Sequence, residues 1–139
     1  MIFPQLNYLA VLVTAIAIFV LGGLWYSPAV FAKRWIALQG RSEEEMKAAN
    51  HLPMPVMLLI SFCCGLLFAL ALAVLLHHYS HMDAAKGAMI GALCWLGFQA
   101  STSYVTSLFS TRPTLLWVID SGYNLVSAIM AGLILGGWR

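Results

Sequence analysis

The sequence predicts an all-α polytopic membrane protein: a four-transmembrane-helix bundle, folded as one domain over residues 1–139, with a short interfacial amphipathic helix between the first two spans. Hydrophobic residues make up 62% of the chain and charged residues only 9%, whereas a soluble domain is about a quarter charged. Apolar runs at about residues 6–26, 54–76, 84–109 and 114–137 each have the roughly 20 residues that cross a bilayer. The lipid bilayer is therefore the expected partner, and a net charge of +2 gives no reason to expect nucleic acid.

The first predicted span ends where its composition changes. Trp25 and Tyr26 close the apolar run, and both residue types favour the membrane–water boundary. Pro28 disfavours helical geometry in the residue before it, and Asn7 at the opposite end could cap the helix. Because no basic residue precedes the run, we expect a retained span rather than a cleaved signal peptide.

Residues 29–53 form the longest polar connection, and two short helices are expected in it. Apolar side chains recur there at helical spacing around two basic ones, which is typical of an amphipathic helix on a membrane surface; they are Val30, Phe31, Trp35, Ile36 and Leu38, around Lys33 and Arg34. Ser42 and Glu45 then form a capping box that starts a second short helix, to about Asn50.

Small residues recur every four positions in the remaining spans, and such stripes allow close helix packing in lipid. They are Gly65, Ala69 and Ala73 in the second span, Gly87 and Gly91 in the third, and Ala128, Gly132 and Gly136 in the fourth. Because the stripes offer more packing surface than one small bundle needs, they predict a homo-oligomer, a dimer or a trimer.

The loops predict the topology. Asp83 is placed to cap the third span, and the short link at residues 110–113 makes the third and fourth spans antiparallel neighbours. Basic residues mark cytoplasmic loops; Lys33, Arg34, Arg41, Lys47 and Arg112 lie on one side, against Lys86 and Arg139 on the other. We therefore expect a multi-pass protein of the inner (cytoplasmic) membrane, with both termini outside.

The fourth predicted span carries an acid, Asp120, inside its apolar run. If the span is helical, this carboxyl group lies roughly 9 Å deep, where an uncompensated charge costs at least about 2 kcal/mol. Equal depth would place Ser61 and Tyr104 near it, with Asn124 one turn deeper on the same face. The expected substrate or ion pathway comprises Trp25, Tyr26, Ser61, Ser103, Tyr104, Asp120, Tyr123 and Asn124.

Two interpretations of Asp120 remain open. In the structural one, the carboxyl group accepts hydrogen bonds from Tyr and Ser hydroxyls, or pairs with Arg112, and sets the helix register. In the functional one, Asp120 is a titratable group in a proton, cation or small-substrate pathway, since acids inside a membrane often mark such pathways. The predicted function is accordingly a small transporter or channel-like protein, and the alternative is a non-catalytic scaffold or partner-binding subunit.

Other chemistry has little support in the sequence. His77, His81 and Asp83 are weak candidates for a Zn²⁺ or Cu²⁺ site, because such a short cluster is also typical of interfacial polar residues. The three cysteines lie within apolar runs and are expected to be packing residues. With no phosphate-binding glycine loop and no nucleophile–His–acid set at one depth, we expect no cofactor, no bound metal and no enzyme.

The chain resembles the DUF1761 family of small bacterial membrane proteins of uncharacterised function. The resemblance covers most of the chain and is carried by the segments Leu21-Gly22-Gly23-Leu24-Trp25-Tyr26-Ser27-Pro28, Phe31-Ala32-Lys33-Arg34-Trp35 and Ile119-Asp120-Ser121-Gly122-Tyr123-Asn124. It implies the four-span fold and a site at Trp25, Tyr26, Asp120 and Tyr123. A His often stands in the family pattern where this chain has Asn124, so the resemblance implies no Asp–His proton relay here.

Overall fold

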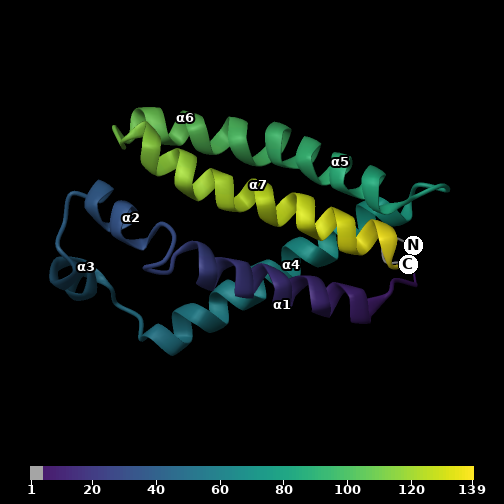
Figure 1. Cartoon of the computed structure of the whole chain (residues 1–139), viewed down its shortest axis with the longest axis horizontal. Helices are drawn as coiled ribbons and strands as arrows, with labels where there is room; N and C mark the ends of the chain where they lie inside the picture. The colour runs from purple at the N-terminus through teal and green to yellow at the C-terminus, as the bar shows by residue number, and fades with distance from the viewer. Residues whose placement is uncertain (1–4) are drawn as a thin grey trace.

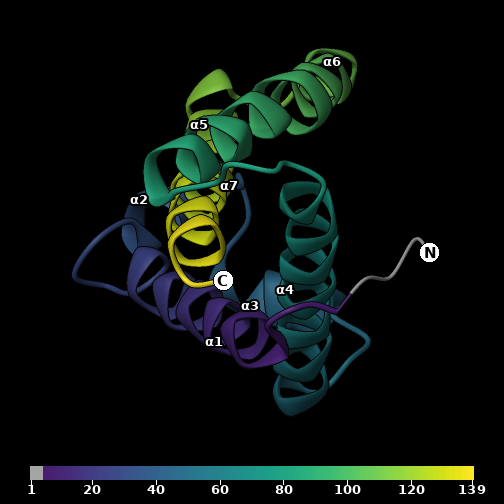
Figure 2. The same cartoon turned by 90° about the vertical axis from the view of Figure 1, so that its right-hand side faces the viewer.

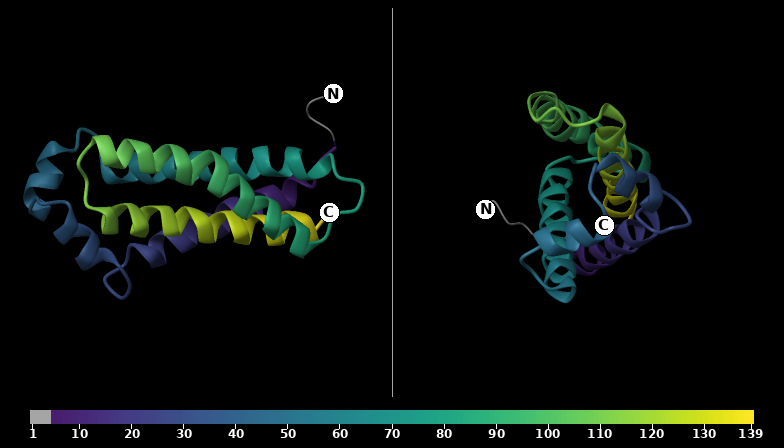
Figure 3. Two further views of the ribbon diagram at one scale, coloured as in Figure 1. Left: turned by 90° about the horizontal axis from the view of Figure 1, so that it is seen from above. Right: turned by 90° about the vertical axis from the view of Figure 1, so that its left-hand side faces the viewer.

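The computed structural model describes residues 5–139 as helices joined by short connections. Their order is α1 (Tyr8–Trp25), α2 (Ala32–Leu38), α3 (Glu43–Ala49), α4 (Met54–His77), α5 (Ala84–Cys94), η1 (Trp95–Ala100), α6 (Ser101–Phe109) and α7 (Thr114–Gly137). In Figure 1 the long helices run along the molecule, with α2 and α3 at one end and the start of α1 beside the end of α7 at the other. The view from above in Figure 3 shows the same arrangement.

The all-helical expectation is confirmed for the described residues. Among them, α1, α4 and α7 are long and apolar enough to cross a membrane. The predicted third span appears as three consecutive segments, α5, η1 and α6, in which Trp95–Ala100 is π-helical. Cys94 and Ala100, at the ends of η1, both have right-handed helical backbone angles, so the backbone stays helical from Ala84 to Phe109.

Three predicted helix caps are present. The Asn7 side chain accepts a hydrogen bond from the backbone N–H of Ala10 at 3.1 Å. In the same way, the backbone N–H of Glu45 donates to the Ser42 hydroxyl at 3.1 Å, and the backbone N–H of Lys86 donates to the Asp83 carboxyl group at 2.8 Å. Each cap satisfies one of the backbone donors that the first helical turn leaves free.

Helices α5 and α7 pack with their backbones in contact. A Cβ atom on Gly87 would collide with the carbonyl oxygen of Gly132, and one on Gly91 would collide with that of Ala128. A Cβ on Gly136 would meet the Gly87 Cα at 3.0 Å. The glycines are therefore required by this crossing, because any side chain would push the two helices apart.

The small-residue stripes are thus occupied within one chain. Gly65 of α4 faces Ile18 of α1, just as the stripe of α5 faces that of α7. The stripes consequently no longer argue for a homo-oligomer, and that prediction needs a different basis.

The core lies at the end of the bundle where α1 begins and α7 ends. Figure 2 shows α7 between α5 and α1, with α4 next to α1. Buried core residues come from α1, α4 and α7: Ala10, Val11, Ile18, Ala69, Leu72, Ala73, Leu76, Ala131 and Leu135. The buried residues of α4 begin only at Gly65, so its first half contributes little to this core and lies beside a cavity.

Candidate functional site

Two aromatic donors hold one oxygen of Asp120. The Tyr26 hydroxyl donates to Asp120 Oδ1 at 2.6 Å, and the Trp35 indole N–H donates to the same oxygen at 3.0 Å. Tyr26 is the residue that follows α1, Trp35 lies in α2, and Asp120 lies in the second turn of α7. The carboxyl group therefore joins three elements that are far apart in the sequence.

Local structure brings these donors to α7. After α1, the Ser27 hydroxyl donates to the Leu24 carbonyl at 2.7 Å, and the Phe31 N–H donates to the Trp25 carbonyl at 3.2 Å. This compact turn leads into α2, which lies against α7. Tyr26 and Trp35 then pack edge to face with ring centres 5.7 Å apart, an arrangement that aromatic rings favour.

More aromatic donors bind the backbone around Asp120. The indole of Trp25 donates to the Ile119 carbonyl at 3.0 Å, and the indole of Trp95 donates to the Ser121 carbonyl at 2.9 Å. The Tyr123 hydroxyl reaches back to the Ile18 carbonyl of α1 at 3.0 Å. Such bonds fix the rotation of α7, because each one connects this part of α7 to a neighbouring helix.

A polar cavity of about 340 Å³ lies beside Asp120, between α6 and α7. Its lining is mainly hydroxyl, amide and charged side chains, namely Ser103, Thr106, Ser107, Ser110, Arg112, Asp120, Ser121 and Asn124, with Leu116 and Trp117. This small space can bind a polar solute or an ion, because it is surrounded by a carboxyl group, a guanidinium group and several hydroxyls.

A second cavity, of about 830 Å³, lies among α1, α4, η1 and α7. Tyr26, Tyr123 and Asn124 lie in its wall, as does Ser61 of α4. Asn124 lines both cavities, so its amide group is the point at which the two spaces approach each other.

The structure gathers part of the predicted pathway. Trp25, Tyr26 and Tyr123 surround Asp120, and Asn124 lies one turn along the same helix. Ser103 lies across the polar cavity and accepts a hydrogen bond from the Trp117 indole at 2.9 Å. These residues share one region at the end of the bundle that carries α2.

Two predicted residues lie elsewhere. Tyr104 is 37% exposed and packs against Trp117 with ring centres 4.9 Å apart. Ser61 lines the larger cavity, and its hydroxyl donates to the Met57 carbonyl of its own helix at 2.8 Å. Equal depth brought neither to Asp120, because rise along a helix does not determine the direction in which a side chain points.

The sequence analysis did not identify Trp35 as a hydrogen-bond donor to Asp120 and interpreted it only as an apolar residue of the interfacial helix. The indole N–H of Trp usually finds a hydrogen-bond partner when buried. The segment Phe31–Trp35 is also one of those that carry the family resemblance, and this was the signal in the sequence that could have indicated Trp35 as a site residue. Arg112, a predicted partner of Asp120, lies along the polar cavity, whereas the donors to Oδ1 are aromatic.

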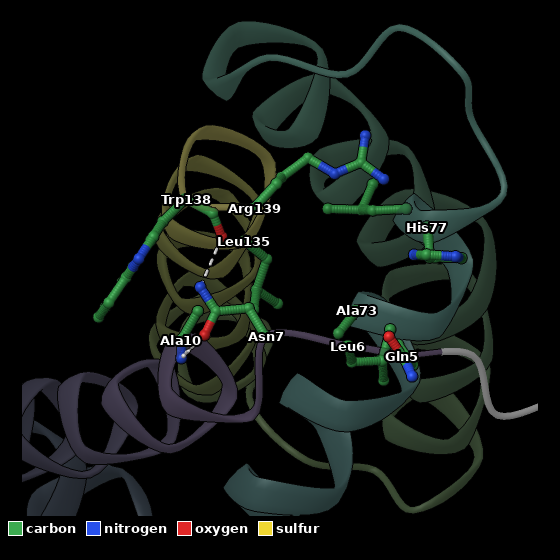
Figure 4. Close-up of a pocket in the computed structure, with 10 residues that line it drawn as sticks. Gln5, Leu6, Asn7, Ala10, Ala73, His77, Leu135, Trp138 and Arg139 are labelled. Atoms are coloured by element: carbon green, nitrogen blue, oxygen red, sulfur yellow. Dashed lines mark hydrogen bonds between the residues drawn. The ribbon is translucent and has the colours of Figure 1, made fainter.

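The opposite end of the molecule carries the weak metal candidates. In the part of the chain that the structure describes, no three His, Cys, Asp or Glu side chains lie close enough to hold a metal ion. Asp83 caps α5. His77 lines a cavity of about 250 Å³ beside Asn7 and Arg139, in which the Asn7 amide donates to the Trp138 carbonyl at 3.5 Å (Figure 4).

Comparison with known sequences identifies a family. A family model described as "Protein of unknown function (DUF1761)" matches residues 9–136, which is nearly the whole chain. No curated protein and no solved structure matches the chain.

Proposed function

Because the chain belongs to the DUF1761 family, a family of unknown function, its role has to be inferred from its own site, and we propose that it is an integral membrane protein that moves protons, cations or small polar solutes by means of Asp120. The observation that carries this proposal is the place of Asp120 in the wall of the 340 Å³ polar cavity. An acid inside a membrane protein is a functional candidate by default.

The proposal includes four membrane spans, with the run from Ala84 to Phe109 as the third. Its outer surface is apolar: Met89 is 71% exposed, Phe98 76% and Phe109 87%. Exposed apolar patches of this kind are rare on soluble proteins. Its hydroxyl groups also suit lipid, since Ser101 and Thr102 donate to carbonyls of their own helix at 2.7 and 2.8 Å.

Helix α2 is proposed to lie at the membrane interface. Lys33 and Arg34 are exposed, whereas Trp35 is partly buried and bonded to Asp120. The loops at this end carry most of the basic residues, which places them on the cytoplasmic side. In this topology both termini lie outside the cytoplasmic membrane of a bacterium.

Asp120 and Asn124 provide a polar route toward the membrane centre. Both line the polar cavity, and Asn124 also lines the larger one. The seven steps from Asp120 to Ser127 rise about 10 Å along α7, so these side chains bring polar groups well into the apolar layer. A proton or cation that enters the polar cavity near Arg112 would reach the carboxyl group of Asp120 before the amide group of Asn124.

The alternative role is a scaffold without transport. It is favoured by the two donors on Asp120 Oδ1, because a carboxyl group with these hydrogen bonds can hold α2 and the end of α1 against α7 without any part in transport. Under this alternative, removal of the carboxylate changes stability and leaves ion flux at the background level.

Flux measurements in proteoliposomes separate the two roles. Purified protein is reconstituted around dyes that report pH, Na⁺ or K⁺, one dye in each preparation, and the matching ion gradient is applied to each. We expect flux above that of empty vesicles, and Asp120→Asn should lower it about tenfold or more, the effect of roughly 1.4 kcal/mol at a rate-limiting site. Vesicles with native protein and no flux for any of these ions would favour the scaffold.

Asp83→Asn is the matched control. It makes the same acid-to-amide change at the other end of the molecule, and Asn caps helices about as well as Asp. Flux should therefore stay at the wild-type level. Gel filtration and thermal unfolding of both variants show whether a loss of flux is only a loss of fold.

We also propose that the chain forms a homodimer or homotrimer. Ser103 and Thr106, on the exposed surface of α6, border the polar cavity that also holds Arg112 and Asp120, so hydrocarbon would meet charged groups unless another copy covers this opening. In a background without the native cysteines, Thr106→Cys should form an oxidative crosslink in membranes. Leu67→Cys, on the exposed face of α4, should give less; only monomer from both would contradict the proposal.

A further inference from the structure

The larger cavity is apolar along most of its length and carries hydrogen-bonding groups at one wall. Its volume is about 830 Å³, within the range of cavities that hold small molecules. On α4 it extends from Met54 to Phe68, about 21 Å along the helix axis, which is the length of a long alkyl chain. Within the described part of the chain, none of the residues that line it carries a formal charge.

Polar atoms without partners lie in the opposite wall. Among the described residues, Gln99 Oε1 and Ser127 Oγ are buried and have no hydrogen-bond partner, and both residues line this cavity. Ser127 is only 5% exposed. A buried polar group without a partner destabilises the protein, so a molecule that pairs with these groups would gain affinity.

The surrounding helices decide how such a molecule enters. On one side, the cavity is lined by residues from the exposed half of α4, between Met54 and Cys64. On the facing side it is lined by Gln99 of η1, a segment in which Leu96 and Phe98 are exposed. Both walls are apolar outside and would lie in the membrane. The cavity therefore lies between two helices that face lipid.

We propose that this cavity binds a neutral amphipathic molecule with a long alkyl chain and an uncharged hydroxyl head group, taken up from the bilayer. The hydroxyl group would donate to Gln99 Oε1 and accept from the Ser127 hydroxyl, while Leu58 and Phe68 cover the chain. A carboxylate or phosphate head group fits poorly, because the cavity has no cation to pair with it and an unpaired buried charge is costly. This site adjoins the polar cavity and shares Asn124 with it, so its test measures binding of the amphipathic molecule rather than ion flux.

Photocrosslinking tests the proposal with hexadecanol that carries a diazirine in its chain. Wild-type protein in vesicles is irradiated, and the adducts are mapped by mass spectrometry. We expect adducts at α4 residues of the cavity, such as Leu58 and Phe68, and competition by unlabelled hexadecanol. Hexadecanoate should compete about tenfold less well, as expected for a head group whose charge is left unpaired. Adducts spread evenly over lipid-facing residues, or equal competition by the acid, would overturn the proposal.

Adjacent cysteines supply a matched pair of variants. Cys64 lines the cavity and Cys63 does not, so Cys64→Trp should fill the space and abolish the specific adducts, whereas Cys63→Trp should keep them. Gln99→Leu should weaken labelling about fivefold or more, the loss of one net hydrogen bond, and Phe98→Leu should leave it unchanged. Equal labelling of the two tryptophan variants, each with wild-type thermal stability, would also overturn it.

Discussion

Tyr26 donates a hydrogen bond of 2.6 Å to Oδ1 of Asp120, which lies 94 residues further along the chain. Oδ1 also accepts from Trp35, so one carboxyl oxygen determines where both the end of α1 and α2 meet α7. A Tyr hydroxyl has an ordinary pKa of about 10 and stays a donor at neutral pH. The contact explains why an acid can occupy an apolar helix without facing lipid.

Tyr26→Phe removes this hydrogen bond and keeps the ring. We expect a loss of about 1–2 kcal/mol of unfolding free energy, the usual range for a partly buried bond to a carboxyl group. Thermal and denaturant unfolding in detergent measure it. Tyr8→Phe is the control, since Tyr8 is 59% exposed and should lose nothing; equal stability of the two variants would mean that the Tyr26 bond contributes little.

Gly132→Ala should separate α5 from α7. The added Cβ would collide with the Gly87 carbonyl, and overpacking of this kind costs about 1–3 kcal/mol or more. Gly23→Ala is the matched control, because a Cβ there has no atom within 4 Å and alanine favours a helix by about 1 kcal/mol over glycine. The unfolding temperature should fall for Gly132→Ala and stay or rise for Gly23→Ala; the reverse order would rule out the backbone contact.

Trp35→Phe should loosen α2. The ring is kept and the indole N–H is lost, so the helix no longer bonds to Asp120. Trypsin should then cut faster after Lys33 and Arg34, which are exposed on α2. Trp138→Phe, at the other end of the molecule, should leave the cutting rate unchanged, and an unchanged rate in Trp35→Phe itself would show that α2 is held by other contacts.

The proposed four spans would put the two ends of the bundle on opposite sides of the membrane. In a background without the native cysteines, a membrane-impermeant maleimide on intact cells should label Ser80→Cys directly. It should label Ser110→Cys only after the cells are permeabilised, because the link at residues 110–113 is expected to be cytoplasmic. Labelling of both residues from outside would contradict a third span at residues 84–109.

The sequence by itself determined the local features of this protein. Apolar length predicted the long helices, and side chains that bond within three residues predicted the caps at Asn7, Ser42 and Asp83. The recurrence of Gly87 and Gly91 predicted a close helix contact. All of these depend on neighbours along the chain, so a single sequence is enough to find them.

Only the tertiary structure decided which groups meet. Depth counting placed Tyr104 and Ser61 with Asp120, but each points elsewhere because the rotation of a helix about its axis is set by the packing of its neighbours. Packing likewise chose Trp35 as a donor and directed the glycines of α5 onto α7 rather than toward a second copy. These choices depend on contacts between distant segments, which helical periodicity does not encode.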